Sequence, residues 1–594
     1  MTLHRETKMS RNQNLVVAII ITLIFLLVCP DSFSLGRPRG GRPKIVGELQ
    51  RVIRQKEAEG CDVSEVRNLQ RRAKQAMESG NKEEARQLLQ QAMQKARALT
   101  PGATEQAGST KTSTATRTVT LPIPEPEVIY TVAVPKKEYS DGGRITNFAT
   151  AFETETLKTE DGRLSLQLDD RPVFLETPAA AAAKAVTLSE DSPFGLLDPT
   201  EYTRELADLN AKWIRFSGKD GLIWAFIEPE RGRFDFAKLD KLVTHLSKNK
   251  INLLITVSCY NHWDQIGEGA TLSKGQKPHL MLPKDLDAYR NFLQKAVERY
   301  DGDGIDDAPG SPVARYWQIQ NEVDFFWKDT PQNYAVLLKT SYQAIKKASP
   351  EAKVVIAGIG GVASSKGYNT YAAIIKHLHK IKDKPNDRYF DIFDMHWAST
   401  SQGYAVFGLA RGKLQAVNLG EFLDKLRALF AKYGYKGTPI WITEMSTYTD
   451  SPTTRSGEIV SLQTEQQHAV GLFKMFVYPW SKGVSKIFWV CMEEFHNFAG
   501  VKNGYYDHVG LIHNPKNSGK RNKKLAYHTL RLLIEKTQGV DCTKIEELDS
   551  GTTDVYLYKF MKNGSPLYIA WRDTEKPQTQ IQQPQQRSRF RRRR

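Results

Sequence analysis

The sequence predicts a (β/α)₈ (TIM) barrel with a small accessory β domain and an N-terminal helical hairpin. Short apolar strands alternate with amphipathic helical stretches eight times between about residues 190 and 540. Several of these strands end in polar or charged side chains, as strands that surround one pocket would. The 594 residues are 40% hydrophobic and 25% charged, which is a globular composition long enough for several domains.

The N-terminus is typical of an export signal. His4, Arg5, Lys8 and Arg11 precede the apolar run LVVAIIITLIFLLVC (15–29), and Ser-Phe-Ser (32–34) offers a cleavage site between small residues. We expect residues 1–34 to be a signal peptide or a membrane anchor. The run is short for a spanning helix, which needs about 20 residues, so the expected location is secreted or periplasmic, with anchoring by an uncleaved segment as the alternative.

Residues 45–99 have the periodicity of two amphipathic helices separated by Gly80-Asn81. Asp62 or Ser64 can cap a helix in the first half. We expect a helical hairpin, and a solvated spacer helix is the alternative. The segment 100–118 (TPGATEQAGSTKTSTATRT) lacks periodicity and predicts a flexible linker.

Short β-prone runs flank the predicted barrel on both sides. Segment 119–178 includes DGRLSLQLDD, with the alternation of a strand, and 541–575 includes two runs joined by Asn563-Gly564, a hairpin signal. We expect both segments to pair in one accessory domain. Residues 576–594 are Gln- and Arg-rich and predict a disordered basic tail.

The barrel itself is predicted over 185–540. The eight candidate strands are 194–197, 213–218, 251–258, 314–322, 353–361, 390–397, 439–446 and 486–493. An open doubly wound sheet is the alternative, but it would favour a Gly-rich phosphate loop after the first strand, and none is present. The glycines of IAGIGG (356–361) follow the fifth strand and lack the required spacing.

The net charge of +17 lies mostly at the two ends of the chain. Residues 1–100 carry a net +8 and the last eight residues +6, which leaves +3 for residues 101–586. A nearly neutral body argues against nucleic acid as a partner. The five cysteines have no CxxC spacing, so the sequence predicts neither a zinc site nor a disulfide framework, and no cofactor.

Polar and aromatic residues follow the ends of six predicted strands, and in a barrel they would converge on one mouth. They are Arg215, Asn261-His262-Trp263, Asn321-Glu322, His396-Trp397, Glu444 and Trp489. Two carboxylates across a pocket suit glycosidic bond cleavage, in which one group protonates the leaving oxygen and the other attacks or activates water. Indole rings suit the C–H faces of sugars. No Cys/His cluster accompanies these residues, so no metal is required.

WQIQNE (317–322) and WITEMS (441–446), in this order, resemble the retaining (β/α)₈ glycoside hydrolases with acid/base and nucleophile Glu on strands four and seven. WIRFSG, FDIFDMHW and the segment 510–533 support this resemblance to xylosidase-like and cellulase-like members, which covers about residues 190–575. It implies that Glu322 is the acid/base and Glu444 the nucleophile. It also implies substrate-binding or supporting roles for Arg215, Asn321, His262, Trp263, His396, Trp397 and Trp489.

One position departs from the pattern of many members, which carry Tyr two residues after the strand-six His, where this chain has Ala398. Other readings stay open for several candidates. Arg215 could serve a structural ion pair, His262 could be unrelated to the site, and Trp263 and Trp397 could be packing residues.

The resemblance implies an exported retaining β-glycosidase that hydrolyses oligo- or polysaccharides through a covalent glycosyl-enzyme. One alternative is a carbohydrate-binding or cell-surface protein on an inactive barrel, although both glutamates are present. The other alternative is a transglycosidase, which only product analysis separates from a hydrolase.

Overall fold

The computed structural model describes residues 81–98, 116–135, 152–183, 190–199, 201–217, 221–267, 280–362, 364–405, 407–410, 413–453, 460–519, 521–542 and 544–573, with isolated positions between 48 and 73. The predicted signal or anchor and the basic tail lie outside these residues, as does most of the predicted linker. The chain divides into two compact units, of which Cys29–Ser113 is one. Each unit is described by itself.

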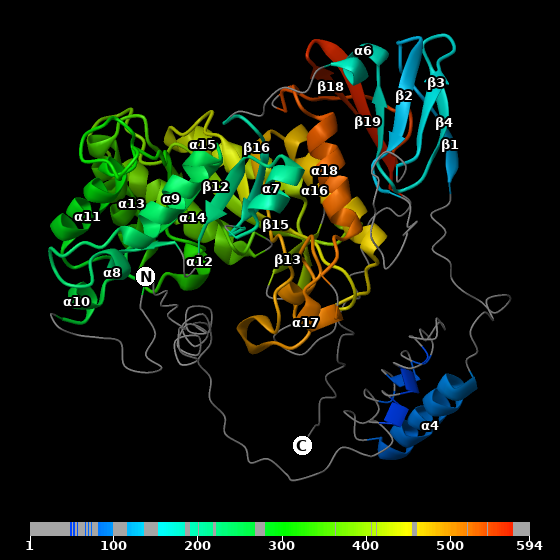
Figure 1. Ribbon diagram of the computed structural model, residues 1–594, viewed down its shortest axis with the longest axis horizontal. Coiled ribbons are helices and arrows are strands. Elements are labelled where there is room, and N and C mark those ends of the chain that lie inside the picture. Colours follow the sequence, from blue (N-terminus) through cyan, green and yellow to red (C-terminus); the bar gives the residue numbers. More distant parts are fainter. Residues whose placement is uncertain are drawn as a thin grey trace, which may run out of the picture. The chain divides into compact units, whose positions relative to one another are not determined.

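Eight parallel strands form the barrel of the larger unit (Figure 1). They are β6 (Phe194–Leu197), β7 (Trp213–Phe216), β9 (Asn252–Ser258), β10 (Tyr316–Ile319), β11 (Lys353–Ile356), β12 (Phe393–Ala398), β15 (Ile440–Ser446) and β16 (Val484–Trp489). The sheet runs β11-β10-β9-β7-β6-β16-β15-β12. Parallel bridges Val355–Ile392 and Ile359–Met395 close β11 onto β12. The predicted barrel fold is confirmed.

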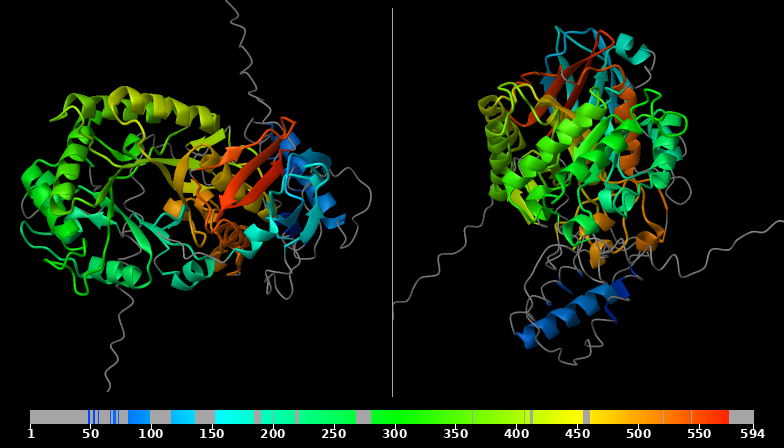
Figure 2. Two further views of the ribbon diagram at one scale, coloured as in Figure 1. Left: turned by 90° about the horizontal axis from the view of Figure 1, so that it is seen from above. Right: turned by 90° about the vertical axis from the view of Figure 1, so that its left-hand side faces the viewer.

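Helices surround this sheet (Figure 2). The longer ones are α7 (Thr203–Leu209), α9 (Ala237–Lys248), α11 (Leu286–Glu298), α13 (Pro331–Ala348), α14 (Ser365–Lys380), α15 (Leu419–Tyr433), α16 (Glu465–Ser481) and α18 (Leu525–Lys536). Polar side chains cap several of these helices: the Thr330 hydroxyl accepts from the Asn333 amide at 3.1 Å, and Thr464 and Gln467 form a capping box. Helices α16 and α18 are buried along most of their length, whereas the others turn a narrower apolar stripe inward.

Aromatic side chains fill the barrel interior near the N-terminal ends of the strands. Trp213 packs edge-on against Tyr316 and Trp441, with ring centroids 4.8 and 5.4 Å away. The Lys486 ammonium lies over the Trp213 ring at 4.1 Å and donates to the Glu190 carbonyl at 3.1 Å. We call this region the barrel base; Leu254, Val355, Ile392 and Phe488 complete its core.

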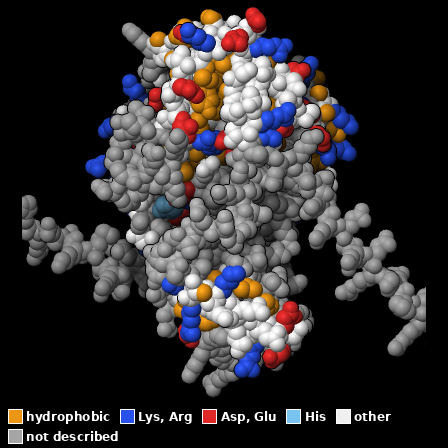
Figure 3. All heavy atoms as spheres, turned by 90° about the vertical axis from the view of Figure 1, so that its right-hand side faces the viewer, with side chains coloured by type: hydrophobic (Ala, Val, Ile, Leu, Met, Phe, Trp, Pro, Cys, Tyr) orange, Lys and Arg blue, Asp and Glu red, His pale blue; other side chains and the backbone are white. Residues whose placement is uncertain are grey.

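Strands from both sides of the barrel segment form one six-stranded antiparallel sheet. Its order is β17 (Glu546–Glu547), β18 (Val555–Lys562), β19 (Ser565–Arg572), β5 (Val173–Glu176), β2 (Glu127–Val132) and β3 (Thr154–Lys158). A second sheet of β1 (Arg117–Leu121) and β4 (Leu164–Leu168) covers one face. Strand β1 thus begins two residues inside the predicted linker. Figure 3 shows acidic and basic side chains intermixed on the described part of this domain's outer surface.

The two faces of the six-stranded sheet have different partners because strand residues alternate. Val173 and Leu175 of β5 point into the sandwich core, whereas Phe174 joins the barrel core and packs against Phe473 of α16 at 5.3 Å. The buried Glu176 carboxylate pairs with Lys562 at 3.1 Å and with Lys536 of α18. The accessory domain is therefore fixed to the barrel by both apolar and ionic contacts.

The smaller unit contains α4 (Lys82–Ala98), which begins with acidic and ends with basic side chains, as the helix dipole favours. Its apolar face packs with residues of the preceding segment, and the buried members are Leu49, Ile53, Val66, Ala73, Ala85, Leu88, Leu89, Ala92, Met93 and Ala96. Among the described residues, none of the helices has the length and apolarity needed to cross a membrane; the run 15–29 is not among them.

Candidate active site

Glu322 and Glu444 lie together at the C-terminal ends of β10 and β15. A carboxylate oxygen of each and a ring nitrogen of His396 all lie within 4.8 Å of one another. Both Glu side chains are 17% exposed, so solvent reaches them. Glu322 and Gln320 have φ values of +40° and +69°, which bend the chain sharply from β10 into the short helix α12 (Val323–Phe326). Such left-handed backbone in non-glycine residues is costly and collects at functional sites.

Arg215 of β7 lies beneath these glutamates and is fully buried. Its guanidinium donates to Glu444 Oε1 at 2.6 Å, to Asn321 Oδ1 at 2.6 Å and to Gln318 Oε1 at 2.8 Å. One planar cation therefore fixes the nucleophile candidate and the Asn-Glu pair that ends β10. The predicted proximity of Arg215, Asn321 and Glu444 is what the structure shows.

His396 of β12 connects the two glutamates. Its Nδ1 lies 2.8 Å from Glu322 Oε1 and 3.7 Å from Glu444 Oε1. On the other side of the ring, Nε2 lies 3.6 Å from Asp394 Oδ2 and 3.4 Å from the Thr443 hydroxyl. Although burial disfavours its charge, the surrounding carboxylates raise the pKa of His396 to about 10.

The two glutamates titrate in opposite directions. Burial raises the pKa of Glu322, and the charges of Glu444 and Asp324 add to the rise although His396 opposes it. Burial would also raise the pKa of Glu444, but the positive charges of His396 and Arg215 outweigh it and lower this pKa. One carboxyl is thereby favoured as an acid and the other as an anion.

The glycines after β11 make room for this cluster. A Cβ on Gly358 would lie 2.3 Å from His396 Nε2, and one on Gly360 would lie 2.6 Å from Glu322 Cδ. The Asp324 carboxylate accepts from the Gly360 and Gly361 amides at 3.1 and 2.9 Å and so holds the loop. The IAGIGG segment, which has no phosphate-loop spacing, thus serves close packing at the site.

Two of the three predicted tryptophans lie on barrel strands and pack away from the glutamates. Trp397 and Trp489 follow inward-facing positions, and alternation turns them to the outer face of the sheet. Trp397 Nε1 donates to the Tyr404 carbonyl at 3.0 Å, and the fully buried Trp489 stacks on Phe476 of α16. The structure therefore places Trp489 between barrel and helix, not at the pocket floor.

Trp263 and His262 lie in α10 (His262–Gln265), beyond the end of β9. The Trp263 ring packs on Trp224 with centroids 5.0 Å apart, and its Nε1 donates to the Glu228 carbonyl at 2.9 Å. Packing is the role that these contacts give to Trp263. His262 is half-buried, and its side chain makes no hydrogen bond to any described residue. Its place in the site stays a prediction.

Several polar groups near the glutamates were not among the predicted residues. Gln318 and Asp394 lie below them, and the Ser446 hydroxyl, two residues beyond Glu444, lies 3.0 Å from the Tyr505 hydroxyl. At the end of β6, Asp198 accepts from the Ser217 amide at 2.7 Å. Alternate residues of a strand face the same side of the sheet, so the sequence could have identified four of these groups. Asp394, Ser217 and Ser446 are each two residues from a predicted site residue, and Gln318 is four residues from Glu322.

Two clusters within the described residues have donor sets that could hold a cation. Glu322, His396 and Glu444 form one, and Asp301, Asp303 and Asp307 in an exposed loop form the other. In the first, the 2.8 Å contact between His396 Nδ1 and Glu322 is a hydrogen bond, and a metal would have to replace its proton. Hydrogen bonding and charge pairing account for this cluster without a metal.

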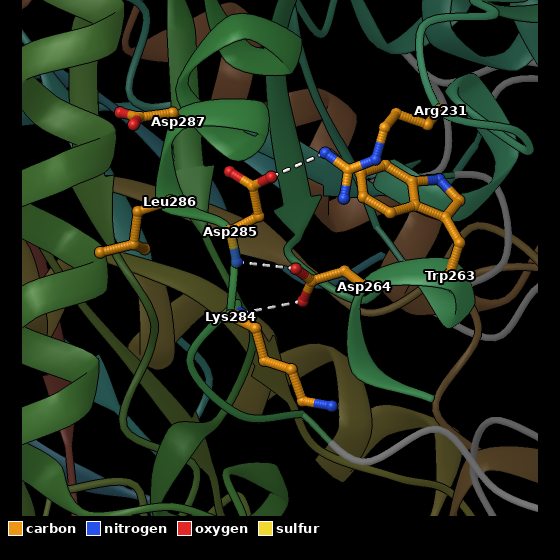
Figure 4. A pocket seen from close by; sticks show the side chains of 7 residues that line it. All are labelled: Arg231, Trp263, Asp264, Lys284, Asp285, Leu286 and Asp287. Atoms are coloured by element: carbon orange, nitrogen blue, oxygen red, sulfur yellow. Dashed lines mark hydrogen bonds and ion pairs between the residues drawn. The ribbon is translucent and has the colours of Figure 1, made fainter. Parts of the chain in front are cut away.

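A pocket of about 590 Å³ lies beyond Trp263, near the N-terminus of α11 (Figure 4). Arg231 stacks on Trp263 at 4.3 Å and pairs with Asp285 at 2.7 Å, while Asp264 accepts from two backbone amides. In these contacts the charged side chains of the pocket wall bind one another or the backbone of the wall. Neither glutamate lines this pocket, so the charged cluster at the strand ends, and not this hollow, defines the candidate active site.

Residues 208–460 match the model of the family described as Glycosyl hydrolases family 39. Among solved structures, a family 39 glycoside hydrolase from the gut symbiont Bacteroides cellulosilyticus WH2 is similar at 16% identity, over 76% of this chain and 86% of that chain, with a TM-score of 0.47. A monomeric beta-xylosidase from Caulobacter crescentus CB15 matches at 15% identity, over 63% and 75%, with a TM-score of 0.42. A glucosidase from Croceicoccus marinus matches at 13%, over 64% and 76%, with a TM-score of 0.42. No curated protein matches the sequence.

The matched segment runs from α7 to the loop after β15 and contains both Glu322 and Glu444. It therefore covers the strands that carry the two carboxylates and the arginine beneath them. The resemblance drawn from WQIQNE and WITEMS is confirmed: this chain is a glycoside hydrolase built on a (β/α)₈ barrel.

Proposed function

We propose that this enzyme cleaves β-glycosidic bonds with retention of anomeric configuration, with Glu444 as nucleophile and Glu322 as acid/base. The observation that carries this proposal is the pair of carboxylates with oxygens within 4.8 Å of each other and with opposite pKa shifts. Retaining enzymes hold their two carboxyl groups about 5–5.5 Å apart, whereas inverting enzymes leave about 6.5–9.5 Å for a water molecule. The separation here supports retention.

In the first step, Glu444 attacks the anomeric carbon while protonated Glu322 transfers its proton to the departing glycosidic oxygen. The C–O bond to the leaving group breaks and an ester bond to Glu444 forms. Arg215 holds Glu444 Oε1, and Oε2 accepts no hydrogen bond from the described residues. That oxygen is therefore the one available to attack.

In the second step, Glu322 is ionised because it has given up its proton. It removes a proton from a water molecule, which attacks the anomeric carbon and releases Glu444. His396 contacts both carboxylates and would stabilise whichever one carries the negative charge. The same residues thus support both half-reactions.

The proposed substrate is an oligo- or polysaccharide outside the cytoplasm. The basic and apolar N-terminal segment, residues 1–34, supports the proposal of export. If this segment is not cleaved, it would also anchor the enzyme to the membrane. A transglycosidase would use the same first step and replace water with a sugar hydroxyl in the second.

Hydrolysis of aryl β-glycosides tests this function. The panel contains xyloside, glucoside, galactoside, mannoside and fucoside, with the Glu444→Gln variant as the control. We expect one or more substrates to be cleaved by the unmodified enzyme alone, and the anomer first seen by proton NMR to be the β-form. An α-anomer as the first product would overturn retention.

A polysaccharide panel follows if no aryl glycoside reacts, because an endo-acting enzyme needs longer glycans. Release of reducing ends that Glu444→Gln abolishes would support the proposal. Binding without cleavage in both panels would favour the inactive-barrel alternative, and oligosaccharides longer than the substrate would identify transglycosylation.

A further inference from the structure

Asp394 is a buried carboxylate beneath His396 to which the catalytic cycle above assigns no step. It lies on β12, two residues before His396, and is fully buried. Its Oδ1 accepts from the Thr443 amide at 3.0 Å, and its Oδ2 accepts from the Thr443 hydroxyl and from Gln318 Nε2, both at 2.5 Å. A buried carboxylate with this many donors is held in one orientation.

That orientation places Asp394 on the opposite side of the imidazole from Glu322. The Asp394 Oδ2 atom lies 3.6 Å from His396 Nε2, while Glu322 Oε1 lies 2.8 Å from Nδ1. Both ring nitrogens thus face carboxylate oxygens. Only the imidazolium carries a proton on each nitrogen, so it is the form that satisfies both sides.

We propose that Asp394 is a positioning residue that neutralises the charge of His396 and thereby lets Glu322 keep its proton between turnovers. This inference rests on the proposed acid/base role of Glu322. In the arrangement Glu322–His396–Asp394, the His396 imidazolium stays charged while Glu322 beside it stays protonated.

The charges around His396 support this assignment. Asp394 approaches from β12, Glu444 from β15, Arg215 from β7, and Glu322 and Asp324 from the turn after β10. From α14, the Tyr371 hydroxyl donates to the Gly358 carbonyl at 2.6 Å and adds no charge. Asp198 at the end of β6 interacts with both Arg215 and Glu444. Five carboxyl groups therefore surround two cations, so full ionisation would leave an excess of buried negative charge.

The geometry distributes the cations unequally among these carboxyl groups. Arg215 binds Glu444 at 2.6 Å, and the Asp324 carboxylate accepts two backbone amides. Because Asp394 supplies an anion at Nε2 of His396, Glu322 at Nδ1 can stay neutral although its 2.8 Å hydrogen bond is the shorter of the two contacts. It is also the carboxyl that the reaction needs in its protonated form.

Removing the charge of Asp394 changes this balance by one unit. The imidazolium then loses the anion that faces Nε2 and keeps the Glu444 carboxylate, 3.7 Å from Nδ1. With less negative charge around it, the Glu322–His396 pair loses one proton at a lower pH, from either partner along their 2.8 Å hydrogen bond. The alkaline limb of kcat/KM, which reports that proton, therefore moves to lower pH.

The experiment is the pH dependence of kcat/KM for the full chain, measured on a cleaved glycoside with a poor leaving group. We expect Asp394→Asn to move the alkaline limb down by about one pH unit or more. The matched control is Asp391→Asn, a half-buried carboxylate just before the same strand that pairs with Lys346 at 3.1 Å. It should leave the limb in place.

A second variant separates charge from packing. Thr443→Val removes a hydrogen bond to Asp394 but keeps the carboxylate charge, so it should lower kcat without moving the alkaline limb. An Asp394→Asn profile with the same limb as the unmodified enzyme, merely scaled in rate, would overturn the inference. In that case the proposed catalytic function would still stand.

NMR titration of the His396 ring nitrogens tests the charge without relying on turnover or on the folding of Asp394→Asn. We expect the unmodified enzyme to keep His396 as an imidazolium at pH 8. A neutral ring at pH 7 would refute the inference, whereas loss of all activity in the glycoside panels would refute only the catalytic function on which it builds.

Discussion

The two ends of the barrel interior both bury cations, but they treat them differently. At the mouth, Arg215 and His396 lie among carboxylates, with Arg215 bonded to Glu444 at 2.6 Å. At the barrel base, Lys486 lies over the Trp213 ring and is hydrogen-bonded to backbone carbonyls. Burial lowers the pKa of Lys486 to about 7, whereas carboxylates raise that of His396 to about 10.

This contrast shows what a matched charge contributes to each end. The cations at the mouth stay charged because the reaction needs ionised groups there. Burying the whole cluster costs desolvation free energy, which the ion pairs offset. The barrel base has no such requirement, and aromatic packing dominates it. Substitutions of the catalytic carboxyl groups at the mouth should therefore act first on activity, and substitutions in the aromatic packing of the base first on stability.

The largest expected effect is on turnover. Glu444→Gln should lower kcat roughly 10⁴-fold or more, because the nucleophile is lost while the rest of the cluster remains. The control at the barrel base is Trp441→Phe, which should keep kcat within about two-fold and lower the free energy of unfolding by about 1–3 kcal/mol. Steady-state kinetics and urea unfolding measure both. Equal losses of activity in the two variants would contradict the contrast between the ends.

The next effect is on stability and compares the two buried cations directly. Arg215→Met should cost about 3–5 kcal/mol of unfolding free energy, because it strands the Glu444 carboxylate and two amide oxygens. Lys486→Met removes no ion-pair partner and should change stability by no more than about 1–2 kcal/mol at pH 7. Chemical denaturation of both variants gives the comparison. A larger cost for Lys486→Met would mean that the base depends on its cation more than the mouth does.

A smaller effect on activity tests the close packing at the mouth. Gly360→Ala places a Cβ 2.6 Å from Glu322 Cδ and should displace that carboxyl, lowering kcat about 10²-fold. Gly420→Ala in the first turn of α15, where the nearest atom is 3.3 Å away, is the matched control and should leave kcat unchanged. Unaltered kinetics in Gly360→Ala would show that the loop after β11 yields easily.

The smallest effect is a pH dependence at the base. The folded-state pKa of Lys486, about 7, lies below its unfolded value of about 10.4, so the unfolded chain binds more protons between these values. Stability should therefore rise with pH from about 7 to 10, by up to about 1.4 kcal/mol per pH unit from this residue. Unfolding at pH 7.5 and 9 should show this slope in the unmodified enzyme and lose it in Lys486→Met. A slope that survives the substitution would assign it to other groups.

The sequence predicted the barrel and the principal charged residues because both have local signals. Strand periodicity located all eight strands, and the Asn-Glu at the end of one strand identified Glu322 and Asn321. The tryptophans were harder, because an aromatic residue at a strand end looks the same whether it faces the pocket or a helix. A shift of one residue along the strand decides whether a side chain faces the pocket or the surrounding helices, as the neighbours His396 and Trp397 show.

Other features required coordinates. Strand phase places Asp394 and Gln318 on the inner face of the sheet, but a polar residue in an apolar strand gives no hint of its hydrogen-bond partners, which come from the structure. The sequence showed only that Gly358 and Gly360 lack the spacing of a phosphate loop. Their short distances to His396 and Glu322 explain why glycine is needed there. The roles of the predicted site residues stay predictions until the variants above are measured.

The pairing of β5 with β19 has a consequence for how the chain is made. Val173–Glu176 leaves the ribosome long before Ser565–Arg572, its partner across the accessory sheet. At about 5–20 residues per second, the interval is roughly 20–80 seconds, during which one edge of β5 has no partner strand. An unpaired edge invites association with other chains. Completion of the accessory domain therefore waits until β19 has been translated, and the barrel must emerge beside an unfinished sheet.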